Sequence, residues 1–245
     1  MEEDLSSYIF QNYRKDEPYQ PTDEERETLQ KKHEVFQEIT SEFPVSLGKD
    51  ASRKERQERI DLDVPDSTLT YGELDFVSIG EVFQTIKKRY AVIPEGGVFY
   101  DLGSGTGKGV VTGALLHPFE ECRGIELLSG LHGISCQVKE KYDAKFPKAV
   151  AENPQVWSSA PKVNMILGDM FEVDWTDASF IFANSTCYSH EMMKQIAEKE
   201  VPVGTIALSM TKEFPSNKWQ VLESVRKQMS WGEGTVYIQR RVPEE

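Results

Sequence analysis

A glycine-rich segment, FYDLGSGTGKGVV at residues 99–111, constrains the fold of this chain more than any other feature. An apolar run that ends at Asp101 precedes the glycines, and a run of small and apolar residues follows them. A buried strand, a tight glycine turn and a helix in this order form the ligand-binding turn of many α/β proteins. The segment therefore predicts an α/β fold with a ligand at this turn.

Three classes of ligand use such turns: nucleoside phosphates, dinucleotides and S-adenosylmethionine. A P-loop needs a Ser or Thr after its lysine, but Gly109 follows Lys108 here. A dinucleotide turn would need its third glycine where Lys108 stands. What remains is the pattern D-x-G-x-G-x-G, which is typical of the S-adenosylmethionine turn of class I methyltransferases. Its members are Asp101, Gly103, Gly105 and Gly107.

Two further acidic residues follow the next two predicted strands. Glu126 ends the strand CRGIEL, where a carboxylate can accept hydrogen bonds from both hydroxyls of a ribose. Asp169 ends the strand before MF, where it can accept from an adenine amino group while Met170 covers the ring. Together with the glycine turn and in this order, the two acids favour an adenosyl cofactor.

The chain changes character near residue 70, which predicts a helical cap region at 1–70 and a methyltransferase domain at 71–245. An amphipathic helix at 23–43 and a second, more polar helix at 50–62 are expected before the boundary. Helices alternate with short apolar strands after it, which predicts βαβ units and a mainly parallel, Rossmann-like sheet with helices on both faces. Helices are predicted at 76–90, 107–117, 130–146, 191–200 and 219–229. Strands are predicted at 98–103, 122–127, 163–169, 179–185, 204–210 and 234–241.

Composition and charge limit the partners and the cellular compartment that are expected. The 245 residues carry a net charge of -13, which opposes strong binding to nucleic acid phosphates and favours a basic partner. The N-terminus lacks a signal-peptide pattern and no apolar run is long enough to cross a bilayer, so an intracellular protein of the nucleus or cytoplasm is expected. Three widely spaced cysteines predict reduced thiols and no metal site.

Five segments resemble the disruptor-of-telomeric-silencing histone lysine methyltransferases, which use a seven-strand class I fold and not a SET domain. The segments are TYGELDF, FYDLGSGTGK, GIE, GDMF and FIFANS, and the resemblance spans about residues 69–237. The family has the corresponding patterns Y-G-E, V-D-L-G-S-G-x-G-Q, G-D-F and V-I-F-V-N-N. The Y-G-E segment is the most specific, because other class I enzymes have nothing comparable there.

The resemblance implies S-adenosylmethionine as cofactor and a basic protein as methyl acceptor. It favours a histone as that protein. It also implies that Asn184 and Tyr237 carry the catalysis, Asn184 by orienting the acceptor amine. Aromatic walls around that amine are expected from Phe182, Tyr188, Tyr237 and Trp231. The residues that it assigns to cofactor binding are Tyr71, Gly72, Glu73, Asp101, Gly103, Ser104, Gly105, Gly107, Lys108, Glu126, Asp169, Met170 and Asn184.

Two departures from the family leave alternatives open. Lys108 replaces a glutamine, which we interpret as an ammonium that meets the cofactor carboxylate. STCYSHEM follows Asn184 where the family has a second asparagine and a phenylalanine, so the acceptor pocket is expected to differ. His190 in this segment is interpreted as a solvent-facing residue at a helix start and not as a base. The alternatives are a non-histone protein or small-molecule acceptor, or a binding module without catalysis.

Overall fold

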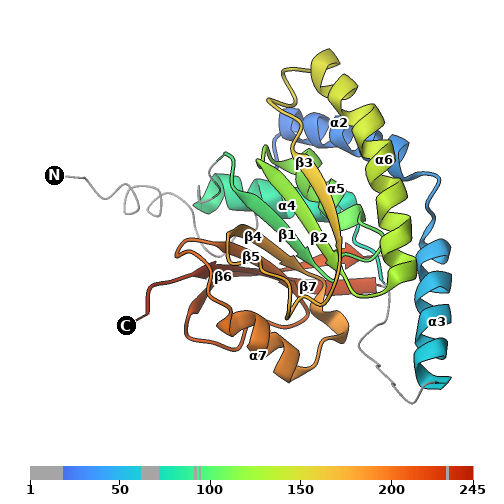
Figure 1. The fold of residues 1–245 in the computed structure, drawn as a ribbon. Helices are drawn as coiled ribbons and strands as arrows, with labels where there is room; N and C mark the ends of the chain where they lie inside the picture. The colour runs from blue at the N-terminus through green and yellow to red at the C-terminus, as the bar shows by residue number, and fades with distance from the viewer. Residues whose placement is uncertain (1–18, 62–71, 91–92, 94, 230–231, 245) are drawn as a thin grey trace.

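One seven-stranded sheet organises the part of the chain that the structure describes, in the order β3-β2-β1-β4-β5-β7-β6 (Figure 1). The structure, a computed structural model, describes residues 19–61, 72–90, 93, 95–229 and 232–244. The strands are Val98–Leu102 (β1), Glu121–Glu126 (β2), Lys162–Leu167 (β3), Ala178–Ala183 (β4), Ile206–Met210 (β5), Trp219–Met229 (β6) and Gly232–Arg241 (β7).

The first five strands pair in parallel, and β7 pairs antiparallel with β5 and with β6. Parallel strands need crossovers, which α5, α6 and α7 supply, except that a loop without a helix joins β3 to β4. Because the carboxyl ends of these strands meet at one edge, residues that follow β1, β2, β3 and β4 gather there. The expected mainly parallel α/β sheet is therefore confirmed.

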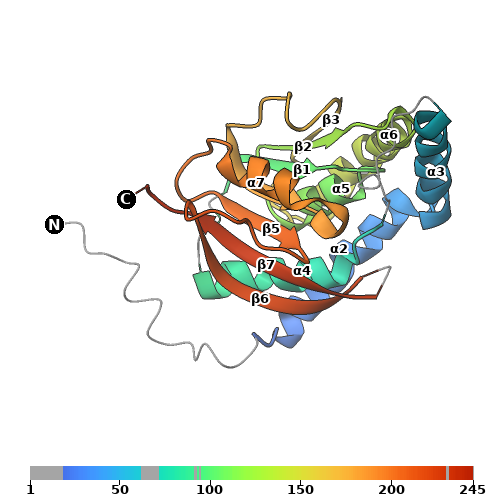
Figure 2. The same cartoon turned by 90° about the horizontal axis from the view of Figure 1, so that it is seen from below.

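Helices cover both faces of the sheet (Figures 1 and 2). In β4, Phe180 and Phe182 pack into the core that contains α2, α4, α5 and α6, whereas Ile181 and Ala183 pack toward α7. This alternation is the period-two pattern of a strand that is buried on both sides. The helices are Asp23–Thr40 (α2), Val45–Asp61 (α3), Phe76–Thr85 (α4), Ile86–Tyr90 (η1), Lys108–Leu116 (α5), Ser129–Glu152 (α6), Ser185–Cys187 (η2) and His190–Glu198 (α7).

The helix predicted at 219–229 is wrong, because this segment is the strand β6. Its apolar residues recur every three or four positions, which suggested a helix. The spacing arises from a bulge: Val221 and Glu223 oppose the consecutive residues Gln239 and Ile238, so Leu222 is the extra residue. The bulge shifts the alternation of side chains between the two faces of the sheet by one residue. The hydrogen bonds to β7 then make the segment a strand and not a helix.

Half-buried charged side chains of β6 form ion pairs with residues of α4 and η1. Arg89 donates to both carboxylate oxygens of Glu223 at 3.0 Å, and Lys227 forms an ion pair with Glu81. Inward-pointing charges on an edge strand also discourage pairing with another chain. These pairs therefore fix β6 against the helix layer while protecting the edge of the sheet.

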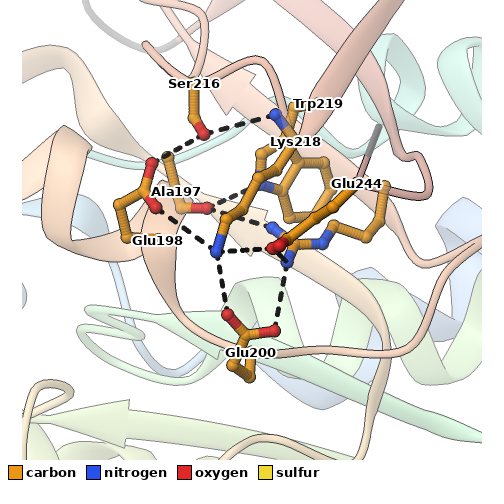
Figure 3. Close-up of polar contacts among 8 residues, drawn as sticks. Ala197, Glu198, Glu200, Ser216, Lys218, Trp219 and Glu244 are labelled. Carbon is orange, nitrogen blue, oxygen red and sulfur yellow. Dashed lines mark hydrogen bonds and ion pairs between the residues drawn. The ribbon is translucent and has the colours of Figure 1, made fainter.

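A polar cluster anchors the C-terminal end of α7 to the start of β6 and the end of β7 (Figure 3). Lys218 forms ion pairs with Glu198, Glu200 and Glu244. The indole Nε1 of Trp219 donates to the Ala197 carbonyl oxygen at 2.9 Å. Because α7 begins next to the carboxyl edge of β4, this cluster helps to hold α7 at that edge.

The N-terminal helices pack onto the sheet domain. Helix α2 starts with a capping box between Thr22 and Glu25, and its Leu29 and Ile39 enter the same core as β1 and β4. Helix α3 starts at Val45, five residues before the predicted start at 50. The division at residue 70 stays a prediction. Among the described helices, none combines the length and apolarity needed to cross a bilayer.

Candidate active site

The glycine turn joins β1 to α5 with three left-handed residues, because φ is +79° at Gly103, +55° at Gly105 and +78° at Gly107. Residues that carry a side chain rarely adopt these backbone angles. A Cβ at Gly103 would also lie 2.2 Å from the hydroxyl oxygen of Tyr188. The Gly103 and Ser104 amides both donate to the Ile125 carbonyl oxygen at 2.9 Å, which fixes the turn to the end of β2.

Glu126 links the glycine turn to the start of α6. One of its carboxylate oxygens accepts from the Gly105 amide at 2.7 Å, and the other accepts from the Leu128 amide at 2.8 Å. Burial raises the pKa of Glu126, and these amide bonds oppose the shift. Each oxygen keeps a further lone pair, so the carboxylate can still accept hydrogen bonds from a ligand.

Asp101 lies beneath the first turn of α5 and is 3% exposed. Gly109 makes room for it, because a Cβ at position 109 would lie 2.2 Å from Asp101 Oδ2. Burial raises the pKa of Asp101 to about 8, and the charge of Glu126 adds to this shift. A buried carboxyl with such a pKa beside a cavity is typical of a ligand site.

Asp101→Asn is expected to remove a pH dependence from the stability of the ligand-free protein. The unfolded chain ionises Asp101 with a pKa of about 3.9, whereas the native protein holds that proton to about pH 8. The contribution of Asp101 to the free energy of unfolding is therefore fully present below about pH 4 and is lost as the pH rises to about 8.

Urea unfolding at pH 5 and pH 8 measures this effect. The stability of Asp101→Asn relative to the wild type should rise between the two pH values, while the exposed control Glu152→Gln should show no such trend. An equal difference at both pH values would mean that Asp101 ionises normally in the native protein.

Lys108, the first residue of α5, forms a bidentate ion pair with Glu73. Its Nζ lies 2.8 Å from Oε1 and 2.7 Å from Oε2, and the two side chains are 15% and 9% exposed. The pair closes the cavity wall between the glycine turn and the segment that precedes α4. The expected contact of Lys108 with a cofactor carboxylate thus stays a prediction, and its partner here is Glu73.

Asn184 follows β4 and faces the same space. Its Nδ2 donates to the Gly72 carbonyl oxygen at 3.0 Å, whereas its Oδ1 is buried without a hydrogen-bond partner among the described residues. Nearby, the Tyr188 hydroxyl donates to the Leu102 carbonyl oxygen at 2.6 Å. Burial raises the pKa of Tyr188, with a further rise from Asp101 and Glu126, so its phenol stays neutral.

These side chains surround one cavity of about 430 Å³, a volume within the range of small-molecule sites. Asp169 and Met170 contribute from the end of β3, and the Asp169 carboxylate accepts from the Phe171 amide at 2.9 Å. The predicted residues that line the cavity are Gly72, Glu73, Asp101, Gly103, Ser104, Gly105, Lys108, Glu126, Asp169, Met170, Phe182, Asn184 and Tyr188.

Other predicted residues lie elsewhere. Gly107 is the N-cap of α5 and shapes the turn without lining the cavity. Tyr237 lies in β7 opposite Ser209 and Ser224 and does not line the cavity. Tyr71 and Trp231 lie outside the described residues.

Sequence reasoning missed the wall that α7 supplies, which consists of Met192 and Gln195. Their separation by three residues places them on one helix face, directly after the segment with Asn184, and this spacing was the available signal. His190 is exposed at the start of α7, where Ser189 is the N-cap. No group of three or more His, Cys, Asp or Glu residues in the described chain is arranged to hold a metal ion.

The residues at the cavity fit an adenosyl cofactor. The glycine turn brings backbone close to the cavity, Glu126 and Asp169 present acceptors from adjacent strands, and Ser104 Oγ and Asn184 Oδ1 are buried without partners among the described residues. Lys108 at this turn is followed by Gly109 and not by the Ser or Thr that a phosphate-binding loop needs. Fold and site together define a class I methyltransferase.

The chain matches the family described as "Histone methylation protein DOT1" over residues 63–228, which is more than half of its length, and it belongs to that family. This confirms the resemblance predicted from the sequence, and the chain is a methyltransferase. A protein-lysine N-methyltransferase of Saccharolobus islandicus (strain REY15A) is 25% identical over 148 residues, which cover 60% of this chain and 81% of that protein.

Two solved structures are similar to this chain. The rRNA methyltransferase aviRa from Streptomyces viridochromogenes has a TM-score of 0.50 at 12% identity, over 69% of this chain and 86% of that chain. An RNA methyltransferase from Salinibacter ruber, solved with S-adenosyl-L-homocysteine, has a TM-score of 0.47 at 23% identity, over 67% of this chain and 92% of that chain.

Proposed function

We propose that this methyltransferase transfers a methyl group from S-adenosylmethionine to the side-chain amine of a protein lysine. S-adenosylmethionine is its methyl donor, as the glycine turn predicted. The observation that carries the lysine assignment is the buried, unpartnered Oδ1 of Asn184, an acceptor at the cavity wall beside apolar and aromatic side chains. The name of the Saccharolobus relative and the family description support a protein lysine, and the family description favours a histone.

The chain's own residues provide binding, alignment and desolvation. Glu126 would accept from the ribose hydroxyls and Asp169 from the adenine amino group, with Met170 against the ring. The bound cofactor supplies an activated methyl group on a sulfonium, so alignment provides most of the rate acceleration. Asn184 Oδ1 would accept a hydrogen bond from the lysine amine. This bond would orient the amine so that the nitrogen lone pair points at the methyl carbon.

Proton removal from the acceptor does not require a base in this proposal. A lysine has an ordinary pKa near 10.4, and an apolar environment lowers it because burial disfavours the charged form. Phe182 and the neutral phenol of Tyr188 line the cavity and provide such surroundings. The acceptor therefore enters neutral, or loses its proton to solvent before transfer.

S-adenosylhomocysteine is expected to raise the melting temperature of the protein, whereas ATP and NAD should leave it unchanged. Glu126→Ala should weaken S-adenosylhomocysteine binding by about 1–3 kcal/mol, because its charge-assisted hydrogen bonds to the ribose are lost. Titration calorimetry gives the affinities, with the exposed Glu120→Ala as control. The cofactor assignment fails if the wild-type protein binds no adenosyl ligand.

The acceptor is tested by transfer of a labelled methyl group to histones, nucleosomes and proteins of a cell lysate, followed by mass spectrometry of the labelled residue. Label on a lysine supports the proposal, and label on histone lysines supports its narrower form. Label on a small molecule, or cofactor binding without any transfer, would contradict it. The last outcome would identify a binding module that keeps the fold.

A further inference from the structure

The start of α6 is capped by a residue from another helix. Its N-cap residue, Leu128, has no side chain that can accept a hydrogen bond. Glu55 of α3 takes that role, because its Oε1 accepts from the Ser129 amide at 3.1 Å and its Oε2 accepts from the Gly130 amide at 3.0 Å. A carboxylate at a helix N-terminus satisfies free amides and is stabilised by the helix dipole.

Two carboxylates thus accept hydrogen bonds from the same short turn. Glu126 accepts from the Leu128 amide, and Glu55 accepts from the next two amides. Only Leu127 and Leu128 separate Glu126 from the start of α6, and both leucines line the cavity. Any displacement of the α6 start would therefore move the turn to which the Glu126 carboxylate is bonded.

Helix α3 contacts the start of α6 at this point. A Cβ at Gly130 would lie 3.5 Å from Glu55 Oε2 and 3.6 Å from the Ala51 Cβ, which are ordinary van der Waals distances, so α3 lies within contact distance of the α6 start. Helix α3 lies alongside α6 in both views (Figures 1 and 2). Its own sequence is strongly polar, and Glu55 is one of the polar side chains that attach it to α6.

We infer that Glu55 is a positioning residue for Glu126, through which docking of α3 on the α6 start sets the affinity for the adenosyl cofactor. This inference rests on the proposed function, since it assigns ribose recognition to Glu126. The coupling is reciprocal: if docked α3 favours cofactor binding, bound cofactor favours docked α3 by the same factor. Helix α3 then acts on the cofactor site without contacting the ligand.

Glu55→Ala is expected to raise the Kd for S-adenosylhomocysteine three- to tenfold, and Glu55→Gln, which keeps one acceptor oxygen, should have a smaller effect. Because the residue acts on binding, kcat at saturating cofactor should stay unchanged while the KM for the cofactor rises. Glu58→Ala, an exposed acid on the same helix, is the matched control. Titration calorimetry and steady-state kinetics of the full chain measure these effects.

Amide hydrogen exchange separates positioning from simple stabilisation. In the wild type, S-adenosylhomocysteine should slow exchange at Ser129, Gly130 and along α3, and Glu55→Ala should abolish the slowing in α3. If Glu55→Ala and Glu55→Gln lower the melting temperature but leave the Kd unchanged, the inference is wrong while the proposed function stands. If the wild type itself binds no S-adenosylhomocysteine, the proposed function fails and this inference fails with it.

Discussion

Replacing Asn184 by alanine should lower kcat roughly 100-fold, the size of effect seen when one transition-state hydrogen bond is lost in other enzymes. Binding of S-adenosylhomocysteine should change much less, because the lost contact acts on the acceptor amine during transfer. The substitution removes the buried, unpartnered Oδ1 and also the Nδ2 hydrogen bond to the Gly72 carbonyl oxygen. Steady-state kinetics with the acceptor identified by mass spectrometry, together with calorimetry, separate the two effects.

His190→Ala is the control for this experiment, since His190 is exposed and does not line the cavity. Its kcat and pH profile should match those of the wild type. In both proteins the rate should increase with pH above neutrality, because a larger fraction of the lysine is deprotonated. Loss of transfer in His190→Ala, with only a mild effect of Asn184→Ala, would instead indicate a general base and an acceptor other than lysine.

The cofactor side of the cavity was predictable because its chemistry lies at the ends of consecutive parallel strands. Asp101 and Glu126 lie at the carboxyl ends of β1 and β2, and Asp169 comes shortly after β3. Parallel strands bring such ends to one edge whatever the details of packing. The glycine turn was recognisable because left-handed backbone restricts the residue type locally. Local patterns therefore sufficed for the position of these residues.

Contacts between segments that are distant in the sequence could not be predicted from local patterns. Asn184 was expected at the cavity, but its bond to the carbonyl of Gly72, 112 positions away, follows from how the segment before α4 packs. The strand β6 was missed for a related reason: its bulge at Leu222 imitates helical spacing, and only pairing with β7 decides between the two structures. Tyr237 was assigned to the site from its motif, yet β7 places it away from the cavity lining.

Lys108→Met should destabilise the ligand-free protein by about 2–4 kcal/mol, because it leaves the Glu73 carboxylate, 9% exposed, without its ammonium partner. The same variant should bind S-adenosylhomocysteine more weakly if Lys108 also meets the cofactor carboxylate. Chemical unfolding measures the first effect. Calorimetry with S-adenosylhomocysteine and with 5′-methylthioadenosine, which lacks the amino-acid part, measures the second.

The double variant Lys108→Met/Glu73→Gln tests whether the stability effect comes from the pair itself. Removing the carboxylate's charge takes away the buried charge that lost its ammonium partner, so the double variant should be more stable than Lys108→Met alone, with a coupling of about 1–3 kcal/mol. Additive losses would mean that the two side chains stabilise the native state independently. Equal weakening of both adenosyl ligands by Lys108→Met would show that Lys108 shapes the cavity wall without contacting the cofactor carboxylate, since only one of these ligands carries that group.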